Sequence, residues 1–106
     1  MQVIISPAAK ADILRASSWY EAARPGLGTS FLQRVDEAVE KIGRNPLTYR
    51  KVKGQNRRIN LERFQYALFY RVEGEAIVVA CVHSRRDPKL VKERASGILP
   101  MRPPKP

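Results

Sequence analysis

The feature of this sequence that most constrains its fold is a change in the spacing of its apolar residues near Tyr49. Before that point, apolar residues recur every three or four positions, which is typical of amphipathic helices. After it, they alternate with polar residues or form short continuous runs, which is typical of β-strands. The 106 residues have room for one domain, so the helices must pack on the sheet that follows them.

Two helices are predicted in the first half. A short β-rich run, Gln2 to Ile5, leads into Ser6-Pro7, where serine suits an N-cap and proline the first helical position. This helix should end at Pro25-Gly26, and a second should run from a Thr29 cap to Gly43. Together they should form a hairpin. The two apolar stripes comprise Ala9, Ile13, Ala16, Tyr20 and Ala23, and then Leu32, Val35, Val39 and Ile42.

Three strands are predicted in the second half. From Arg57 to Leu61, apolar side chains alternate with polar ones. From Tyr66 to Val72, the same period of two places Tyr66, Leu68, Tyr70 and Val72 on one face. The segment Ala76 to Val82 is apolar on both faces, as in a central strand. Gly74 supplies the turn of a hairpin between the last two. The predicted fold class is α+β, with an N-terminal strand and a helix hairpin packed on an antiparallel β-sheet meander.

The ends of the chain and its composition narrow the class of protein. The Pro-rich, basic residues 97–106 predict an extended tail after a single domain at residues 1–96. No stretch approaches the ~18 apolar residues of a membrane-spanning helix, and the N-terminus lacks a secretion signal, so we expect a cytoplasmic protein with no membrane partner. With Cys81 and His83 as the only cysteine and histidine, we expect no disulfide, metal or cofactor.

Positive charge is concentrated in the second half. The chain has 20 Lys and Arg against 10 Asp and Glu, a net charge of +10. Residues 1–43 carry five basic and five acidic side chains, whereas residues 44–63 carry seven basic and one acidic, and residues 84–106 seven and two. Such a field attracts polyanions and acidic protein surfaces. We therefore expect one cationic surface that receives an anionic partner.

Three segments of the second half form a pattern in their order and spacing. They are Arg58-Ile59-Asn60-Leu61-Glu62-Arg63-Phe64, then Leu68-Phe69-Tyr70-Arg71-Val72, then Val82-His83-Ser84-Arg85-Arg86-Asp87-Pro88. This pattern resembles the signature of the RelE/ParE toxin family, which includes ParE-like plasmid stabilisation proteins, and the resemblance extends over roughly residues 2–95. Gln65 departs from it, because relatives usually have proline there; glutamine would allow the strand to begin one residue earlier.

The resemblance implies a role as well as a fold. It implies a compact sheet with an N-terminal helix hairpin, and the toxin component of a type II toxin–antitoxin system. The partner would be an acidic cognate antitoxin that folds over the basic face, giving a toxin–antitoxin hetero-oligomer. Members resembling ParE inhibit growth by binding DNA gyrase, and members resembling RelE cleave mRNA on the ribosome. A basic nucleic-acid-binding module without a toxin role is a third alternative.

The residues favour binding over catalysis. Cleavage of RNA needs an acid, a base and cations around the phosphate, and the candidate catalytic set for a nuclease is Arg58, Arg71 and His83. No aromatic residue follows Tyr70 to stack a base, and Ser84 and Arg85 stand where the family's nucleases commonly have a tyrosine. We therefore expect a ParE-like toxin. The candidates for binding the target or the antitoxin are Arg57, Arg58, Arg71, His83, Arg85 and Arg86.

Several candidates also have structural interpretations. His83 fits a strand-end histidine that bonds a backbone carbonyl, and Arg58 fits an exposed arginine on an edge strand. Trp19 lies off the apolar stripe and fits either a partner contact or packing against the hairpin loop. An even-numbered hairpin loop would place Arg71 beside Ala76, Val78 and Ala80 and His83 on the other face, whereas a bulged three-residue loop would bring the two together.

Overall fold

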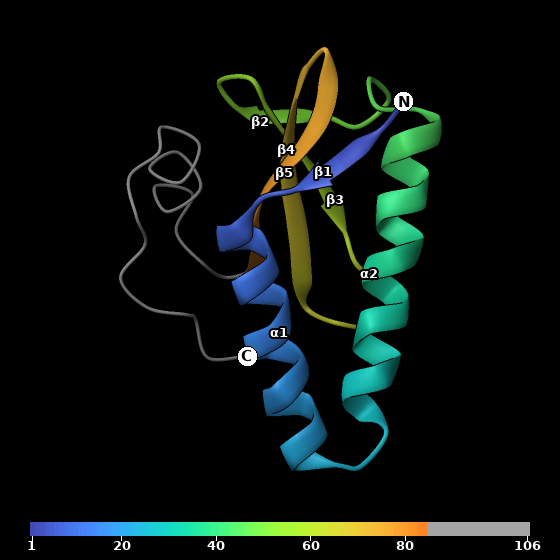
Figure 1. The fold of residues 1–106 in the computed structure, drawn as a ribbon, viewed down its shortest axis with the longest axis vertical. Coiled ribbons are helices and arrows are strands. Elements are labelled where there is room, and N and C mark those ends of the chain that lie inside the picture. Colours follow the sequence, from blue (N-terminus) through green and yellow to red (C-terminus); the bar gives the residue numbers. More distant parts are fainter. Residues whose placement is uncertain (85–106) are drawn as a thin grey trace.

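The elements of the computed structural model, which describes residues 1–84, follow the order that the sequence predicts, with one additional strand, β2, that the sequence analysis did not predict. They are β1 (Val3–Ile5), α1 (Pro7–Ala23), α2 (Leu27–Arg44), β2 (Lys51–Lys53), β3 (Asn56–Asn60), β4 (Tyr66–Glu73) and β5 (Glu75–His83). One sheet has the strand order β1-β5-β4-β3-β2, and the helix hairpin covers one of its faces (Figure 1). The α+β class is confirmed, although β1 runs parallel to β5 and makes the sheet mixed. The predicted boundary between residues 96 and 97 lies outside the described residues.

The start of α1 is set by its own sequence. The Ser6 side chain accepts a hydrogen bond from the backbone N–H of Ala9 at 3.1 Å, and Pro7 occupies the first helical position. Ala9, Ile13 and Ala16 are buried, as the stripe predicted. No helix in residues 1–84 is long and apolar enough to cross a membrane.

The start of α2 is set by the other helix. This helix begins at Leu27 rather than after a Thr29 cap, so that prediction was wrong. Its N-cap is Gly26 at φ 91°, and the Glu21 carboxylate of α1 accepts the N–H groups of Gly26 and Gly28, each at 3.0 Å. A carboxylate at this position satisfies free amides and favours the positive end of the helix dipole. The cap is therefore a tertiary contact that local sequence does not reveal.

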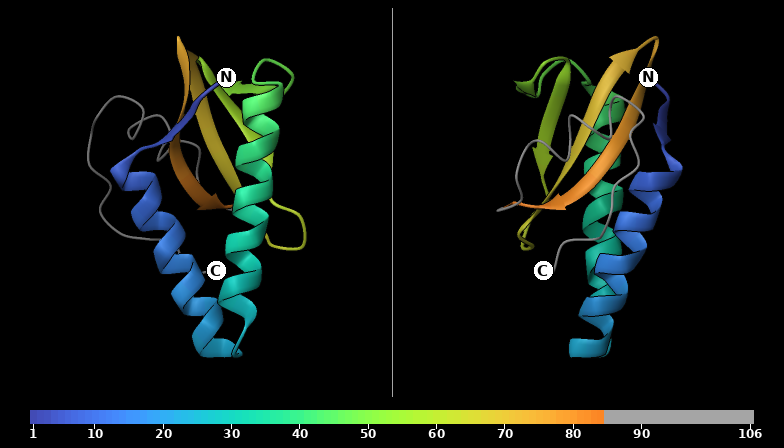
Figure 2. Two further views of the ribbon diagram at one scale, coloured as in Figure 1. Left: turned by 45° about the vertical axis from the view of Figure 1, so that its right-hand side comes forward. Right: turned by 90° about the vertical axis from the view of Figure 1, so that its left-hand side faces the viewer.

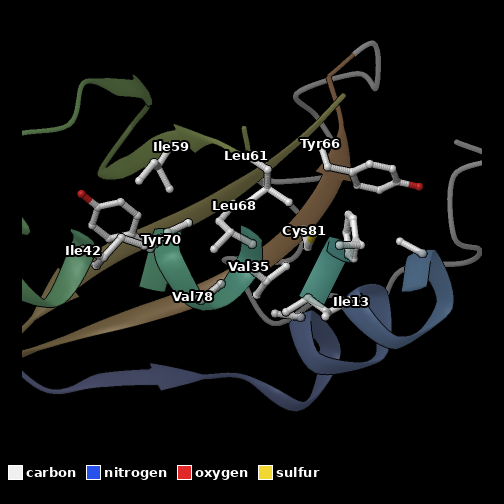
Figure 3. Packing of buried hydrophobic residues seen from close by; sticks show 14 of the residues in the cluster. Ile13, Val35, Ile42, Ile59, Leu61, Tyr66, Leu68, Tyr70, Val78 and Cys81 are labelled. Atoms are coloured by element: carbon white, nitrogen blue, oxygen red, sulfur yellow. The ribbon is translucent and has the colours of Figure 1, made fainter. Parts of the chain in front are cut away.

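The main core lies between the helices and the sheet. Phe31, Val35, Ala38 and Ile42 form the buried stripe of α2, whereas Leu32 and Val39 are only half-buried, so the sequence located the stripe but misplaced its centre. From β4, the side chains of Tyr66, Leu68 and Tyr70 point into this core, as predicted (Figure 3). β4 begins at Tyr66, so the expectation that Gln65 lengthens the strand was wrong.

A bulge in β5 sets which side chains share a face. Next to the turn, Arg71 pairs with Ile77 and Tyr70 with Val78. This is the register of a hairpin loop with an odd number of residues, here Gly74 alone. The register shifts between Phe69 and Tyr70, so Phe69 pairs with Ala80 and Val79 is the extra residue. Beyond the shift His83 pairs with Tyr66 and faces the helices. Arg71 and His83 therefore lie on opposite faces, as an even-numbered loop would have placed them, but the loop is the single residue Gly74 and the bulge is what separates them.

A buried carboxylate connects α1 to β5. Asp12 is 3% exposed, and its Oδ2 atom accepts the backbone N–H of Cys81 at 3.1 Å. Burial, and secondly the charge of Asp12, raise the pKa of the Cys81 thiol above its usual range. The thiol is therefore protonated and enclosed at neutral pH.

We expect Cys81 to resist thiol reagents in the folded protein, because the thiolate is the reactive form and burial disfavours it. Ellman's reagent should react with the native chain only as fast as the protein opens, and at once in guanidinium chloride. Rapid stoichiometric labelling of the native chain, at a rate that rises with pH as for a free thiol, would contradict this.

Candidate partner-binding surface

Five basic residues of the second half lie on the two strands at one edge of the sheet or directly before them. β2 is an edge strand, and β3 lies between it and β4. No acidic residue occurs from Arg44 to Asn60. We call the cationic group on these two strands and the residue before them the β2–β3 surface; it comprises Arg50, Lys51, Lys53, Arg57 and Arg58. None of the five forms an ion pair within residues 1–84, so their charge is available to an anionic partner.

Arg57 also holds the loop that leads into β2. Its guanidinium donates to the backbone carbonyls of Leu47 at 3.1 Å and Tyr49 at 2.6 Å. The hydroxyl of Tyr70 donates to the Pro46 carbonyl of the same loop at 2.6 Å, and burial raises the pKa of this tyrosine. These bonds fix the loop against the sheet. Arg57 therefore contributes a positive charge to the β2–β3 surface and also holds the loop beside it in place.

Arg58 and Arg71 lie together on the face opposite the helices. Arg58 pairs in register with Phe69, and its guanidinium lies 5.5 Å from the centre of that ring. Its Nε donates to the Asn60 side chain at 2.9 Å. Arg71 follows two residues after Phe69 and contacts Glu73, with 3.1 Å between Nε and Oε1. The interpretation of Arg58 as an edge-strand residue was wrong, because β2 pairs outside β3.

His83 lies apart from these arginines. It faces the helices, and its ring meets that of Tyr66 edge-on with 5.4 Å between centroids. Its pairing partner, Tyr66, is five residues from Arg71 along β4, which corresponds to roughly 17 Å. The structure therefore does not bring Arg58, Arg71 and His83 into one site. Arg85 and Arg86 lie outside the described residues.

A pocket that the sequence did not predict opens beside His83. Its volume is about 500 Å³, and it lies where the helix hairpin meets the loop before β4. Its lining residues are Trp19, Tyr20, Arg24, Leu27, Ser30, Arg34, Arg63, Phe64, Gln65 and His83. Trp19 is 49% exposed, and its position off the apolar stripe was the one sequence signal of this site.

The comparison with protein families decides the identity of the chain. The model of the ParE toxin of type II toxin-antitoxin system, parDE, matches residues 3–88. The chain belongs to the ParE toxin family. The resemblance inferred from the three sequence segments is thereby confirmed, and the family match includes Arg57, Arg58, Arg71, His83 and the two arginines that follow.

Solved structures show the same fold. A chain of the structure titled "Chromosomal ParDE TA system from P. aeruginosa" superposes on this ParE-family chain with a TM-score of 0.69 at 22% sequence identity. The alignment covers 78% of this chain and 95% of that one. No curated protein sequence matches the chain.

Within the described part of this ParE-family chain, no three His, Cys, Asp or Glu side chains are grouped so that they could hold a metal ion. The β2–β3 surface instead presents the positively charged hydrogen-bond donors of arginine and lysine side chains. Guanidinium and ammonium groups recognise carboxylates and phosphates.

Proposed function

We propose that this chain is a toxin that arrests growth by binding DNA gyrase, and that an acidic cognate antitoxin neutralises it. Membership of the ParE family supports the toxin role. The observation that carries the proposal is the β2–β3 surface, where five cationic side chains have no acidic partner in residues 1–84. A solvated cationic surface of this kind attracts anionic partners from a distance and orients them.

The antitoxin is proposed to lie along the β2–β3 surface. An edge strand leaves one row of backbone N–H and C=O groups unpaired, so β2 can accept an added strand from a partner. Acidic side chains on that partner would meet Lys51 and Lys53, both on the edge strand. An acidic, disordered chain that orders on binding would gain both kinds of contact.

The arrangement of the candidate residues supports binding rather than RNA cleavage. In-line cleavage needs its acid, base and phosphate-binding cations within hydrogen-bond reach of one phosphodiester. Here Arg58 and Arg71 lie on one face and His83 on the other. The aromatic ring nearest Arg58, that of Phe69, is 6% exposed and offers no open face for a base.

The proposed target can be tested with the purified full-length chain. We expect it to inhibit supercoiling by gyrase and to leave mRNA intact on translating ribosomes. His83→Ala should retain inhibition of gyrase. Cleavage of mRNA that is abolished by His83→Ala would overturn the proposal in favour of a ribosome-dependent nuclease, and DNA binding without growth arrest would favour a plain nucleic-acid-binding module.

The proposed antitoxin site can be tested with two variants of equal charge. Arg50→Gln/Lys51→Gln/Lys53→Gln removes three charges from the β2–β3 surface, and Lys10→Gln/Arg15→Gln/Lys41→Gln removes three from the helices. With the acidic product of the adjacent gene as probe, we expect the first variant to weaken binding by about tenfold or more at 0.1 M salt, because each exposed ion pair contributes about 0.2–1 kcal/mol. Calorimetry measures this, and equal losses in both variants would contradict the site.

A further inference from the structure

The pocket beside His83 exists because the helices are longer than the sheet they cover. β4 begins and β5 ends at the same end of the sheet. α1 and α2 extend past that end, and the turn between them lies beyond the strands (Figures 1 and 2). Near that turn the hairpin has no strand opposite it, and the loop of Arg63, Phe64 and Gln65 forms the other wall. The β2 strand lies toward the opposite end of the molecule (Figure 1). The pocket is therefore separate from the β2–β3 surface.

The interior of the pocket is apolar and already formed. The ring of Tyr20 meets Phe64 edge-on at 4.9 Å and stacks on the buried Phe31 at 5.4 Å. Trp19 packs edge-on against Tyr20 at 5.3 Å and stays half-exposed. Burial raises the pKa of Tyr20, so its hydroxyl is neutral at physiological pH. The volume of about 500 Å³ falls within the ~300–1,000 Å³ of pockets that bind small organic groups.

The rim of the pocket is cationic. Arg24 and Arg63 are exposed and form no ion pair within residues 1–84. Arg34 is paired with Glu37 at 3.0 Å. The Glu21 carboxylate, on the same hairpin, accepts the backbone N–H groups of Gly26 and Gly28. The rim thus presents two uncompensated positive charges around an apolar hollow.

We propose that this pocket binds an apolar side chain of an acidic protein segment, whose neighbouring carboxylates contact Arg24 and Arg63. An apolar anchor in a preformed pocket with a charged rim is the usual anatomy of a binding hot spot. The inference goes beyond the proposed function, because it assigns a second contact site that does not depend on gyrase being the target.

Charge favours this occupant over the alternatives. The chain's own residues 85–106 carry seven basic and two acidic side chains, and a second copy carries a net charge of +10, so both would bring like charge to the rim. Nucleic-acid bases stack on open aromatic faces, whereas Tyr20 and Phe64 are engaged with each other and only the half-exposed Trp19 remains open. An acidic peptide satisfies both the hollow and the rim.

Trp19 allows a direct test, because it is the only tryptophan of the chain and lies in the pocket wall. The probe is the tryptophan-free peptide Glu-Asp-Glu-Phe-Glu-Asp-Glu, titrated into the full-length protein. We expect a blue shift of the Trp19 emission and protection from acrylamide quenching. A peptide with Ala in place of Phe, and one with Gln and Asn in place of the acids, should each bind at least about tenfold more weakly.

Paired variants locate the binding. Arg24→Gln/Arg63→Asn removes the two rim charges, and asparagine tolerates the positive φ of 71° at residue 63. Arg50→Gln/Lys51→Gln removes the same charge from the β2–β3 surface. We expect about a tenfold loss of affinity in the first and less than about twofold in the second at 0.15 M salt, where distant charges are screened within about 8 Å. Circular dichroism confirms that both variants are folded.

Several results would overturn the inference. They are an unchanged Trp19 emission at saturating peptide, equal losses in the two double variants, indifference to removal of the Phe anchor, and tighter binding of a single-stranded oligothymidylate than of the peptide. The last would identify the pocket as a base-binding site. None of these results bears on inhibition of gyrase, so the pocket and the proposed function can fail independently.

Discussion

Replacing Phe31 with alanine is expected to lower the free energy of unfolding by about 3–5 kcal/mol, a large share of the roughly 5–15 kcal/mol that stabilises a typical domain. Phe31 is fully buried. Its ring contacts three others, with centroid distances of 5.4 Å to Tyr20, 5.2 Å to Phe64 and 5.3 Å to Tyr66. Alanine would leave a cavity where the two helices, the β4 strand and the loop before it meet.

Urea denaturation followed by circular dichroism measures this effect, and two variants grade it. Phe31→Leu retains most of the volume and should cost clearly less than Phe31→Ala. Leu14→Ala removes an apolar side chain that is 55% exposed on α1 and should cost little. If Phe31→Ala destabilised the protein by less than about 1 kcal/mol, the packing described for this cluster would be wrong.

Gly28→Ala is expected to cost about 2–3 kcal/mol although alanine is the better helix former. The helices cross so closely here that a Cβ atom would lie 2.6 Å from the Ser17 carbonyl oxygen and 2.9 Å from the Glu21 Cβ. Two backbones cannot yield as a flexible side chain does, so α1 and α2 would have to separate. Separation would also weaken the bond from the Ser17 hydroxyl to the Gly28 carbonyl, which measures 3.2 Å.

The neighbouring Thr29→Ala is the matched control, because Thr29 is exposed on the same turn and its replacement by alanine also raises helix propensity. Thermal unfolding should show a lowered midpoint for Gly28→Ala and an unchanged or raised one for Thr29→Ala. Gly28→Ala should also alter the Trp19 emission, since the pocket lies between the same two helices. A Gly28→Ala protein as stable as the parent would contradict the close crossing.

Local signals in the sequence predicted most of the fold. Ser6 and Pro7 set the start of α1, and alternation along Tyr66 to Val72 set the core face of β4. The misplaced start of α2 has a different origin, because the carboxylate that accepts its first backbone amides belongs to Glu21, a residue of α1. The parallel pairing of β1 with β5 likewise depends on contacts between residues far apart in the chain. Periodicity carries no information about such contacts.

The candidate site was predicted in its charge but not in its geometry. The net charge of residues 44–63 located the β2–β3 surface, because most cations of that segment fall on two adjacent strands at one edge of the sheet or directly before them. The pocket was missed because its lining comes from both helices, a loop and a strand end, which are adjacent only in the folded chain. Trp19, which lies off the apolar stripe of its helix, was the single sequence signal of the pocket.

The extra residue Val79 has a consequence for homologues of this chain. In a β-strand, one added residue moves every later side chain to the opposite face of the sheet. A relative with an uninterrupted last strand of the same length would turn the residue equivalent to His83 away from its helices and leave the hollow beside them without it. Homologues should therefore divide into two sets according to whether that strand contains the extra residue. In one set the residue equivalent to His83 faces the helices, and in the other it faces away from them, whatever the overall sequence similarity.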